Sequence, residues 1–417
     1  MLHNKFMGVY RMFEAFNQGI RRLGTGCIKW DFREQEFGNA DVIPFSIADA
    51  DYPSCPEIQQ VLVEHIRNNV LGYTDLDGSY LDAVRRWCRE RHDWPVEADW
   101  ITSTAGVVPA VSAAIAALLP AGAQIITQTP LYDPFESVIA ANHCVSVHNP
   151  LIRDKAGRYT MDLEQLEQCM RDGASMMILC NPHNPVGRVW SRQELSAVLE
   201  LCRAYGVILV SDEIHWDIIL PGYHHTTLGK LVTEADNVII CTAPSKTFNI
   251  AGLQTSNIII PKPALRARFQ NWLFSRYLFG ANVLGLKACA AAYTYGDAWA
   301  DEQNRFLSQN AAFVSQYMAQ HIPQAVVTPL EGTYLMWLDL SFLGRTSEEL
   351  VQEIARQGAG VNSGKHYGPQ CDGFIRLNIA CPQSQLEQGL ACIRRAAFSL
   401  SGQSAGTGKA GKEPQTV

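Results

Sequence analysis

The sequence has 417 residues, of which 47% are hydrophobic and 18% charged, so it can form two globular domains or one large domain with a smaller one. The net charge of −7, without blocks of like charge, argues against nucleic acid or a membrane surface as partner. No apolar run approaches the ~18 residues of a membrane helix, and residues 1–22 lack the apolar segment of a signal peptide. The twelve cysteines form no C-x-x-C pair, which favours reduced thiols over disulfides or zinc. We expect a cytoplasmic protein without a metal ion.

Short apolar runs alternate with amphipathic stretches between about residues 100 and 290. The runs are rich in Ile and Val and bounded by polar or turn residues, as strands buried on both faces are. They cover residues 124–128, 176–179, 207–210, 237–241 and 257–260. Residues 191–205, between two of these runs, have apolar side chains at helical spacing. The alternation predicts an α/β domain with a mostly parallel sheet.

The C-terminal part of the chain has a different pattern. Helices are expected near residues 304–321 and 346–357, and strands at 325–327, 333–338 and 374–379, which predicts a smaller α+β domain. We expect residues 61–300 to form the large domain and 301–400 the small one. Residues 1–60 have no sheet of their own and are expected to pack with the small domain. Residues 401–417 are small and polar and are predicted to be disordered.

Polar residues follow three consecutive runs of the expected sheet. Asn184 follows the run at 176–179, Asp212 the next run and Lys246 the third. Each alone has an ordinary explanation, since an Asn-Pro pair is usually a turn, an Asp a helix cap and a Lys a solvated charge. Ligands bind at the carboxyl ends of strands in open parallel sheets. The ordered set of amide, carboxylate and lysine therefore predicts a binding site there.

The three residue types suit pyridoxal 5′-phosphate (PLP). The aldehyde of this cofactor forms an imine with a lysine, and Lys246 can supply the amine and later move protons. A carboxylate such as Asp212 keeps the pyridine nitrogen protonated, so that the ring can draw electrons from the substrate. Asn184 can donate a hydrogen bond to the phenolate oxygen of the ring. Lys246, Asp212 and Asn184 are thus the first candidate site residues.

The phosphate of such a cofactor needs a cradle. Residues 102–107 follow a short β-like segment and open the helical run at 109–119, where free backbone N–H groups can bind an anion. Ala105, Gly106 and Val107 are the candidate phosphate ligands. The alternative stays open that these residues only begin an ordinary helix.

Two further side chains are candidates for contact with the ring and the substrate. Tyr132 follows the run at 124–128, and its aromatic face could stack on the pyridine ring; an ordinary buried tyrosine is the equal alternative. Arg376 is flanked by apolar residues on an expected strand. Its guanidinium group can bind the carboxylate of a small amino-acid substrate through two hydrogen bonds. Asn184 could also contact this substrate. The alternative for Arg376 is a structural ion pair.

Several stretches resemble the fold-type I PLP enzymes, the aspartate aminotransferase superfamily. Within it they are most similar to the class II aminotransferase-like branch of cystathionine β-lyases and cysteine-S-conjugate β-lyases. The matching stretches are residues 22–31, 47–52, 72–74, 181–187, 211–215 and 245–253. The last is the most specific and marks Lys246 as the lysine that binds the cofactor. The resemblance implies the PLP-dependent transferase fold and a homodimer, in which Tyr73 reaches the cofactor phosphate of the neighbouring subunit.

Three positions depart from the pattern of many aminotransferases in this superfamily. Gln254 stands where an arginine binds the phosphate, and Ala243 replaces a serine. The lyase branch commonly lacks that arginine, so Ser245 and Thr242 become candidate phosphate ligands. His215 stands where a tyrosine is usual and is expected to contact either the ring oxygen or Asp212.

The resemblance leaves three functions to compare. The first is a carbon–sulfur β-lyase that converts cystathionine or a cysteine S-conjugate to a thiol, pyruvate and ammonia. The second is an aminotransferase, which uses the same residues, and the third is a catalytically idle PLP-binding regulatory protein. The stretches at 29–31 and 48–51 favour the lyase. A nicotinamide oxidoreductase is disfavoured, because the G-x-G at Gly24 follows no strand and Lys29 stands where the third glycine belongs.

Overall fold

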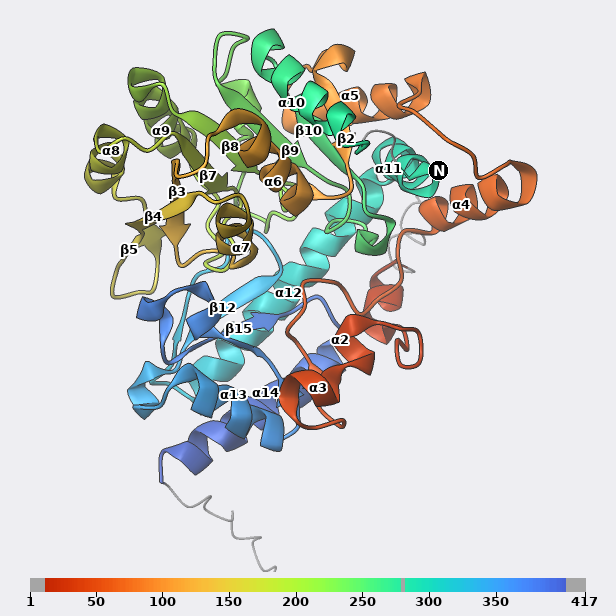
Figure 1. Ribbon diagram of the computed structural model, residues 1–417. Coiled ribbons are helices and arrows are strands. Elements are labelled where there is room, and N and C mark those ends of the chain that lie inside the picture. Colours follow the sequence, from red (N-terminus) through yellow and green to blue (C-terminus); the bar gives the residue numbers. More distant parts are fainter. Residues whose placement is uncertain (1–11, 279–281, 403–417) are drawn as a thin grey trace, which may run out of the picture.

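The computed structural model describes residues 12–278 and 282–402. The segment 403–417, most of the tail predicted to be disordered, lies outside these residues. The described chain forms a larger unit around a seven-stranded sheet and a smaller unit around a four-stranded sheet, and the long helix α12 (Asp297–His321) passes from one to the other (Figure 1). No helix among the residues described is both long and apolar enough to cross a bilayer.

The seven-stranded sheet has the order β2-β10-β9-β8-β7-β3-β4. Its strands are β2 (Ile101–Thr104), β3 (Gln124–Thr129), β4 (Val145–Pro150), β7 (Met176–Cys180), β8 (Ile208–Asp212), β9 (Val238–Thr242) and β10 (Ser256–Ile259). Five strands, from β9 to β4, are mutually parallel, and β10 runs antiparallel to both of its neighbours. The prediction of a mostly parallel sheet is confirmed. The single reversed strand has consequences for the site.

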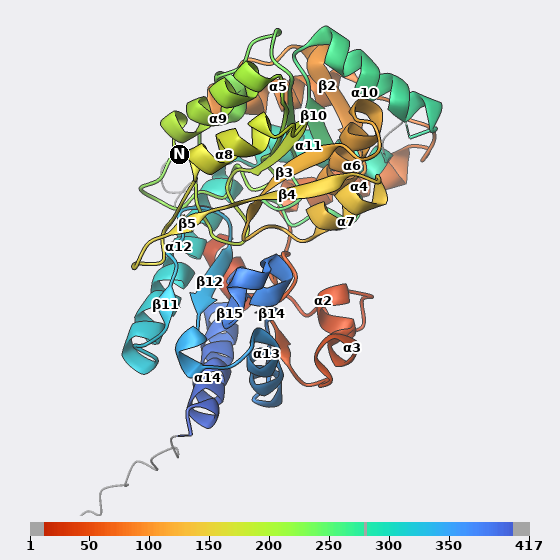
Figure 2. The same cartoon turned by 60° about the vertical axis from the view of Figure 1, so that its left-hand side comes forward.

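The strands of this sheet are apolar on both faces because helices cover both (Figure 2). In β7, Met176 and Ile178 pack with α6, α7 and α10, whereas Met177 and Leu179 pack on the opposite side with α5, α8, α9 and α11. This alternation follows from the two-residue period of a strand. The helices are α5 (Gly78–His92), α6 (Val107–Leu118), α7 (Pro134–Ala141), α8 (Leu163–Arg171), α9 (Arg192–Tyr205), α10 (Pro263–Ser275) and α11 (Val283–Tyr295).

The smaller unit has an antiparallel sheet of order β11-β12-β15-β14. Its strands are β11 (Val326–Val327), β12 (Leu335–Asp339), β14 (Asn362–Ser363) and β15 (Phe374–Asn378), and its helices are α13 (Ser347–Arg356) and α14 (Gln383–Leu400). The N-terminal region joins it, because β1 (Ile43–Pro44) pairs in parallel with β13 (Ala359–Gly360). The remaining α-helices and strands are α2 (Ile28–Asp31), α3 (Arg33–Phe37), α4 (Pro56–Asn68) and the hairpin β5 (Ile152–Arg153) and β6 (Tyr159–Thr160).

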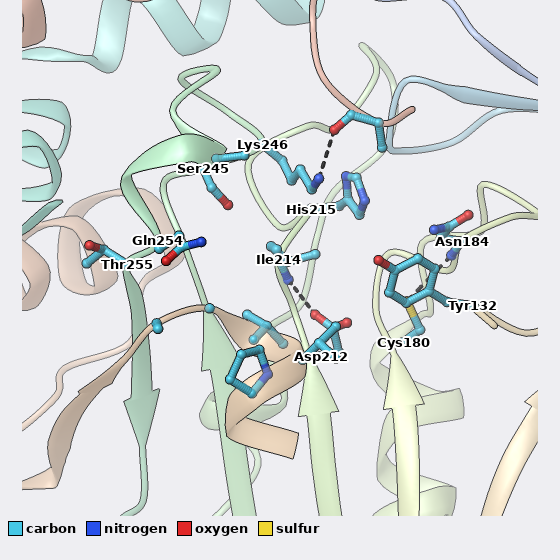
Figure 3. Close-up of a pocket in the computed structure, with 17 residues that line it drawn as sticks. Tyr132, Cys180, Asn184, Asp212, Ile214, His215, Ser245, Lys246, Gln254 and Thr255 are labelled. Atoms are coloured by element: carbon cyan, nitrogen blue, oxygen red, sulfur yellow. Dashed lines mark hydrogen bonds between the residues drawn. The ribbon is translucent and has the colours of Figure 1, made fainter. Parts of the chain in front are cut away.

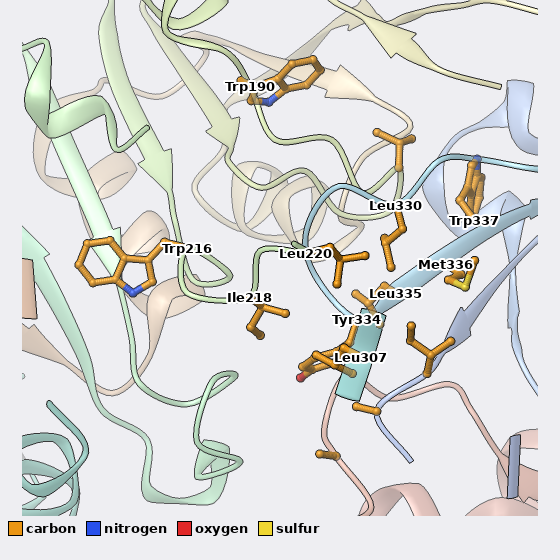
Figure 4. Packing of buried hydrophobic residues seen from close by; sticks show 14 of the residues in the cluster. Trp190, Trp216, Ile218, Leu220, Leu307, Leu330, Tyr334, Leu335, Met336 and Trp337 are labelled. Carbon is orange, nitrogen blue, oxygen red and sulfur yellow. The ribbon is translucent and has the colours of Figure 1, made fainter. Parts of the chain in front are cut away.

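A continuous apolar core connects the two units. Figure 4 shows Trp190 and Trp216, from the loops that follow β7 and β8, and Met336 and Trp337 of β12 within the same cluster. All four side chains are at most 1% exposed. The orientation of the small sheet relative to the large one is therefore fixed by packing, and with it the position of any side chain on β15 relative to the large sheet.

Candidate active site

A cavity of about 190 Å³ lies at the carboxyl edge of the parallel strands (Figure 3). Such an edge is where ligands bind in open α/β sheets. The lining side chains come from the segments after β2, β3, β7, β8 and β9, from the segment between β1 and α4, and from the turn before β10. They are Ala48, Ala105, Gly106, Val107, Val108, Pro109, Tyr132, Cys180, Asn184, Asp212, Ile214, His215, Ser245, Lys246, Ala251, Gln254 and Thr255.

Lys246 lies in the turn after β9, and its ε-amine points into the cavity (Figure 3). Its Nζ donates a hydrogen bond to the carbonyl oxygen of Ala48 at 2.8 Å. Burial lowers the pKa of Lys246, Arg376 lowers it further, and the charges of Asp49 and Asp212 oppose both effects. A lysine with a lowered pKa is a stronger candidate for attack on an aldehyde, because more of its amine is neutral.

Asp212 is the last residue of β8 and is 3% exposed. It continues the row of Val210, so its side chain lies on the face of the sheet that α6 covers. One carboxylate oxygen accepts a hydrogen bond from the backbone N–H of Ile214 at 3.0 Å. Burial raises the pKa of Asp212 to about 6, against that hydrogen bond and the charge of Lys246. A ligand cation beside this carboxyl would favour its ionised form.

Asn184 and Tyr132 approach the cavity from the turns after β7 and β3 (Figure 3). The backbone N–H of Asn184 contacts the Cys180 sulfur at 3.5 Å, and its side-chain oxygen accepts a hydrogen bond from Arg376 at 3.0 Å. That bond leaves the amide N–H₂ of Asn184 as the donor available to a ligand. Burial, assisted by the charge of Asp212, raises the pKa of Tyr132 to about 12, so the phenol stays protonated.

The loop from Ala105 to Val107 leads from β2 into α6 at the same edge of the sheet. Gly106 has φ +136°, a conformation that residues with a side chain rarely adopt, and its carbonyl accepts a hydrogen bond from the Thr104 hydroxyl at 3.0 Å. The N-terminus of α6 is thereby directed at the cavity, with backbone N–H groups that can bind an anion. Ser245 also lines the cavity.

His215 is 3% exposed and neutral, because burial lowers its pKa and the nearby charges of Lys246 and Arg376 lower it further. Its Nδ1 is buried and has no hydrogen-bond partner among the residues that the structure describes. A buried polar atom without a protein partner at the wall of a cavity can be satisfied by a ligand group or a water molecule. His215 lines the cavity together with Asp212 and Lys246.

Arg376 lies on β15 of the small sheet, 5% exposed, and reaches across to the large unit. Its guanidinium donates to Asn184, to the backbone carbonyl of Ser46 at 2.8 Å and to Asn362 at 3.2 Å. No carboxylate of the described residues pairs with it within 4 Å, and its Nε has no partner among them. Arg376 therefore forms no structural ion pair within the described residues, although such a pair was the alternative explanation for a buried arginine here.

Three of the predicted site residues, Arg376, Thr242 and Tyr73, are not among the residues that line the cavity, although Arg376 is bonded to the lining residue Asn184. Thr242, the last residue of β9, is fully buried, and its hydroxyl accepts a hydrogen bond from Asn257 at 3.4 Å. Tyr73 lies in the segment between α4 and α5, and its side chain is fully exposed on this chain. Neither lines the cavity within a single copy of the described chain.

Several lining residues were not among the predicted site residues: they include Ala48, Thr255 and Gln254, whose position was noted only as that of a phosphate-binding arginine in related enzymes. Gln254 and Thr255 precede β10, whereas the sequence-based assignment used residues at the ends of strands. Because β10 is antiparallel, its beginning lies at the edge where its neighbours end. Ala48 comes from the N-terminal segment, 198 residues from Lys246, and no strand pattern could have placed it there.

The donor set of the cavity fits PLP. It offers one buried lysine, one buried carboxyl that lacks a paired cation, an amide donor, an unpartnered imidazole nitrogen and a helix N-terminus for a phosphate. These groups are the chemical complements of an aldehyde, a pyridinium nitrogen, a phenolate oxygen and a phosphate.

Comparisons with known proteins agree with this fit. The family model described as aminotransferase class I and II matches residues 40–393. A relative from Bacillus subtilis (strain 168), named cystathionine beta-lyase PatB, is 40% identical over 91% of this chain and 99% of its own.

Two solved structures have the same fold. A PLP-bound putative aminotransferase from Clostridium difficile 630 is 35% identical with a TM-score of 0.89, and cystalysin from Treponema denticola, which contains PLP, is 34% identical with a TM-score of 0.88. Each alignment covers 92% of this chain and 99% of the other. The predicted PLP-dependent transferase fold is confirmed: the chain belongs to the class I and II aminotransferase family, whose members depend on pyridoxal 5′-phosphate.

Proposed function

We propose that this chain is a PLP-dependent carbon–sulfur β-lyase that converts L-cystathionine or another cysteine S-conjugate to a thiol, pyruvate and ammonia. The observation that carries the proposal is the 40% identity, over nearly the whole length, to a protein named cystathionine beta-lyase, together with a cavity that contains Lys246, Asp212 and Asn184. The likeness to cystalysin supports it. An aminotransferase is the second candidate, because the Clostridium difficile neighbour is named a putative aminotransferase.

Lys246 has two tasks in this reaction. Its amine would hold the cofactor covalently, and as a free amine it would take the proton from the substrate Cα. PLP, when bound, accepts the electron pair that this proton leaves behind. The lowered pKa of Lys246 supports both tasks, because a neutral amine is required for attack and for proton removal.

Asp212 sets the electronic state of the site. Buried, with its pKa raised to about 6, it lacks a compensating cation apart from the more distant charge of Lys246. A protonated pyridine nitrogen beside it would supply that charge, and the carboxylate would in turn keep the nitrogen protonated. The two charges would stabilise each other, and more strongly than in water because Asp212 is buried.

The remaining lining groups would hold the cofactor and orient its ring. The Asn184 amide would donate to the phenolate oxygen, and the Tyr132 ring would lie against the pyridine. His215 has its unpartnered Nδ1 for the ring oxygen or for Asp212. Ala105, Gly106 and Val107 would bind the phosphate through backbone N–H groups, with the Ser245 hydroxyl beside them. Thr242 has the weakest support as a phosphate ligand, since its hydroxyl contacts Asn257.

Arg376 would bind the α-carboxylate of the substrate. It is buried and unpaired with any carboxylate in the described chain, and its Nε has no partner there, so an anion would satisfy it. Its bond to Asn184 ties the substrate carboxylate to the group that orients the cofactor. Because β15 belongs to the small unit, substrate binding would also bridge the two units.

For the assembly, we propose a homodimer in the cytoplasm. The segment after α4 exposes the side chains of Val70, Leu71 and Tyr73, each by 57% or more. Exposed apolar side chains of this kind are expected where a second subunit covers them. In such a dimer Tyr73 would reach the cofactor phosphate of the partner subunit. The free thiols, ten of them buried, are consistent with a reducing compartment.

One assay separates the two candidate activities. Purified protein loaded with PLP is incubated with L-cystathionine, with and without a 2-oxo acid, and pyruvate and thiol are measured. A lyase releases both without the 2-oxo acid, whereas an aminotransferase needs the 2-oxo acid and releases no thiol.

A further inference from the structure

The segment 47–51, which we call the strap, crosses the site beside Lys246. The carbonyl oxygen of Ala48, in this strap, accepts two hydrogen bonds, one from Nζ of Lys246 at 2.8 Å and one from the hydroxyl of Tyr334 at 2.9 Å. Figure 3 shows the first of these bonds at the cavity. A carbonyl oxygen has two lone pairs, so both are used, and the direction in which the amine points is set by the position of one backbone group.

The strap is held in place by side-chain amides. Asn378 of β15 donates to the carbonyls of Ile47 and Asp49 at 2.7 and 2.8 Å, on either side of Ala48. Asn249, three residues after Lys246, accepts from the backbone N–H of Ala50 at 3.1 Å and donates to its carbonyl at 3.0 Å. The strap is therefore attached both to the small sheet and to the turn that carries Lys246.

Ion pairs with residues nearer the N-terminus also hold the strap. Arg22 binds Asp49 through two parallel hydrogen bonds of 2.7 and 2.8 Å, and the same guanidinium donates to the carbonyl of Ala50 at 3.1 Å. Asp49 and Arg22 are each 19% exposed, so water screens the pair only in part. Lys29, which is 1% exposed, pairs with Asp51 at 2.9 Å and completes the attachment.

We propose that Arg22 and Asp49 are positioning residues for proton transfer, because they hold the Ala48 carbonyl against the ε-amine of Lys246. The inference rests on the proposed function, in which the free amine of Lys246 takes the Cα proton. Whenever that amine is free, the strap fixes its nitrogen within the cavity and accepts one of its hydrogens. The carbonyl also stabilises the ammonium that exists after proton uptake, since a hydrogen bond to the charged form favours that form.

Arg22 and Asp49 also change the proton affinity of the Lys246 amine, and they do so in opposite directions. The charged groups that face this amine are Asp49 on the strap, Asp212 on β8 and Arg376 on β15, while His215 and Tyr334 beside it are neutral. Loss of the Asp49 charge lowers the proton affinity at Lys246. Loss of Arg22 removes the closer of the two cations beside Asp49 and leaves only Lys29, at 3.7 Å, so the proton affinity of Lys246 rises.

The test measures exchange of the Cα proton of L-alanine with deuterium oxide by NMR, on protein loaded with PLP. L-Alanine has no leaving group, so exchange reports proton removal by Lys246 whether the enzyme is a lyase or an aminotransferase. Arg22→Met and Asp49→Asn are each expected to slow exchange about tenfold or more at equal cofactor content, the loss typical of one charge-assisted hydrogen bond. Release of thiol and pyruvate is measured separately, so the exchange rates can still be interpreted if the protein proves not to be a lyase.

Matched controls remove the same charges from the same region. Arg21 and Asp41 are exposed, and no hydrogen bond or ion pair of the described residues joins either side chain to the strap, so Arg21→Met and Asp41→Asn should exchange as the wild type does. Arg22→Lys keeps the charge but loses the two parallel bonds, and it should recover part of the rate. Exchange at the wild-type rate in both Arg22→Met and Asp49→Asn would overturn the proposal.

A second readout needs no turnover. The visible band of the bound cofactor changes with pH as the nitrogen of Lys246 gains or loses its proton. The midpoint of that change should move down in Asp49→Asn and up in Arg22→Met, relative to both controls. A merely structural defect would give no such opposite pair of shifts. Midpoints equal to that of the wild type in both variants would contradict the proposal, even if either protein were less stable.

Discussion

Arg376 and Asn184 are joined by a hydrogen bond of 3.0 Å, although they lie 192 residues apart and belong to different units of the fold. The bond occupies the side-chain oxygen of Asn184, so its amide hydrogens are left for a ligand in the cavity. One arginine therefore orients the amide donor. In the proposed function, substrate recognition and cofactor orientation would share this pair.

Arg376→Lys is expected to weaken substrate binding while cofactor binding is maintained. Lysine keeps the charge but cannot form the two-pronged contact, and it cannot reach Asn184, Ser46 and a substrate together. The dissociation constant of an unreactive amino-acid analogue, followed through the cofactor band, should rise about 10- to 100-fold. Arg356→Lys, on an exposed face of α13, is the control. Unchanged affinity in Arg376→Lys would remove this residue from the substrate site.

Asp212→Asn is expected to slow turnover by about two to four powers of ten, which corresponds to about 3 to 5 kcal/mol of transition-state stabilisation. A neutral amide no longer favours protonation of the pyridine nitrogen, so the ring accepts electrons less well. The measurement is kcat at saturating PLP and substrate. Turnover within about twofold of the wild type would show that Asp212 only caps the turn at Ile214.

The same substitution should stabilise the cofactor-free protein. Because burial raises the pKa of Asp212 to about 6, the folded state binds this proton more tightly than the unfolded state. Stability is therefore lost as the pH rises from about 4 through 6, by an amount of about 3 kcal/mol. Without cofactor, the thermal midpoint of Asp212→Asn at pH 7.5 should exceed that of the wild type, and the order should reverse with PLP. A lower midpoint in both states would contradict the assigned pKa.

The sequence predicted the large sheet well because its strands are buried on both faces and leave a continuous apolar signal. The run expected at 207–210 is β8 (Ile208–Asp212), and the run at 237–241 is β9 (Val238–Thr242). The sequence did not indicate that β10 is reversed, because its apolar pattern is the same in either direction. The positions of Thr255 and Gln254 at the cavity depended on that direction.

The part of the site hardest to predict from the sequence acts through the backbone. The stretch around Ala48 was recognised as a resemblance, but every residue has a backbone carbonyl group, so the residue type does not show which carbonyl contacts the site. Its contact with Lys246 spans 198 residues and depends on Asn378 and Asn249. By contrast, Lys246, Asp212 and Asn184 could be placed together because consecutive parallel strands end at one edge.

Lys29→Met should destabilise the protein by about 3 kcal/mol, because it leaves the buried carboxylate of Asp51 without its closer cation, and only Arg22 at 3.2 Å remains. Burial opposes ionisation of Asp51, but Lys29 and Trp30 outweigh it and hold its pKa below the usual value. In the wild type this pair stabilises at neutral pH and loses its effect as the pH falls through the lowered pKa. The difference in thermal midpoint between wild type and Lys29→Met should therefore shrink below about pH 4.

The exposed Lys365 provides the control, since Lys365→Met removes the same charge from a surface pair with Glu348 at 3.6 Å. Its thermal midpoint should stay close to that of the wild type. Equal midpoints for Lys29→Met and Lys365→Met would show that the buried pair adds no stability.

Tyr73 can be tested by mixing subunits. Tyr73→Phe and Lys246→Ala should each be impaired alone, since one removes a phosphate contact and the other the reacting amine. If Tyr73 acts in the neighbouring active site, a mixed dimer of the two variants has one site in which both residues are intact. Activity should then reappear after subunit exchange, at up to half of the wild-type rate per dimer. No recovery in dimers shown to be mixed would place Tyr73 outside the partner's site.

Cleavage of the Cβ–S bond of a cysteine S-conjugate by Lys246 and its neighbours can be tested directly by product stoichiometry. Thiol, pyruvate and ammonia released from L-cystathionine are measured for the purified PLP-loaded protein, without any 2-oxo acid. We expect the three products to form in equal amounts, and we expect Lys246→Ala to form none of them. Turnover that requires a 2-oxo acid and releases no thiol, or full product formation by Lys246→Ala, would contradict the proposed lyase reaction.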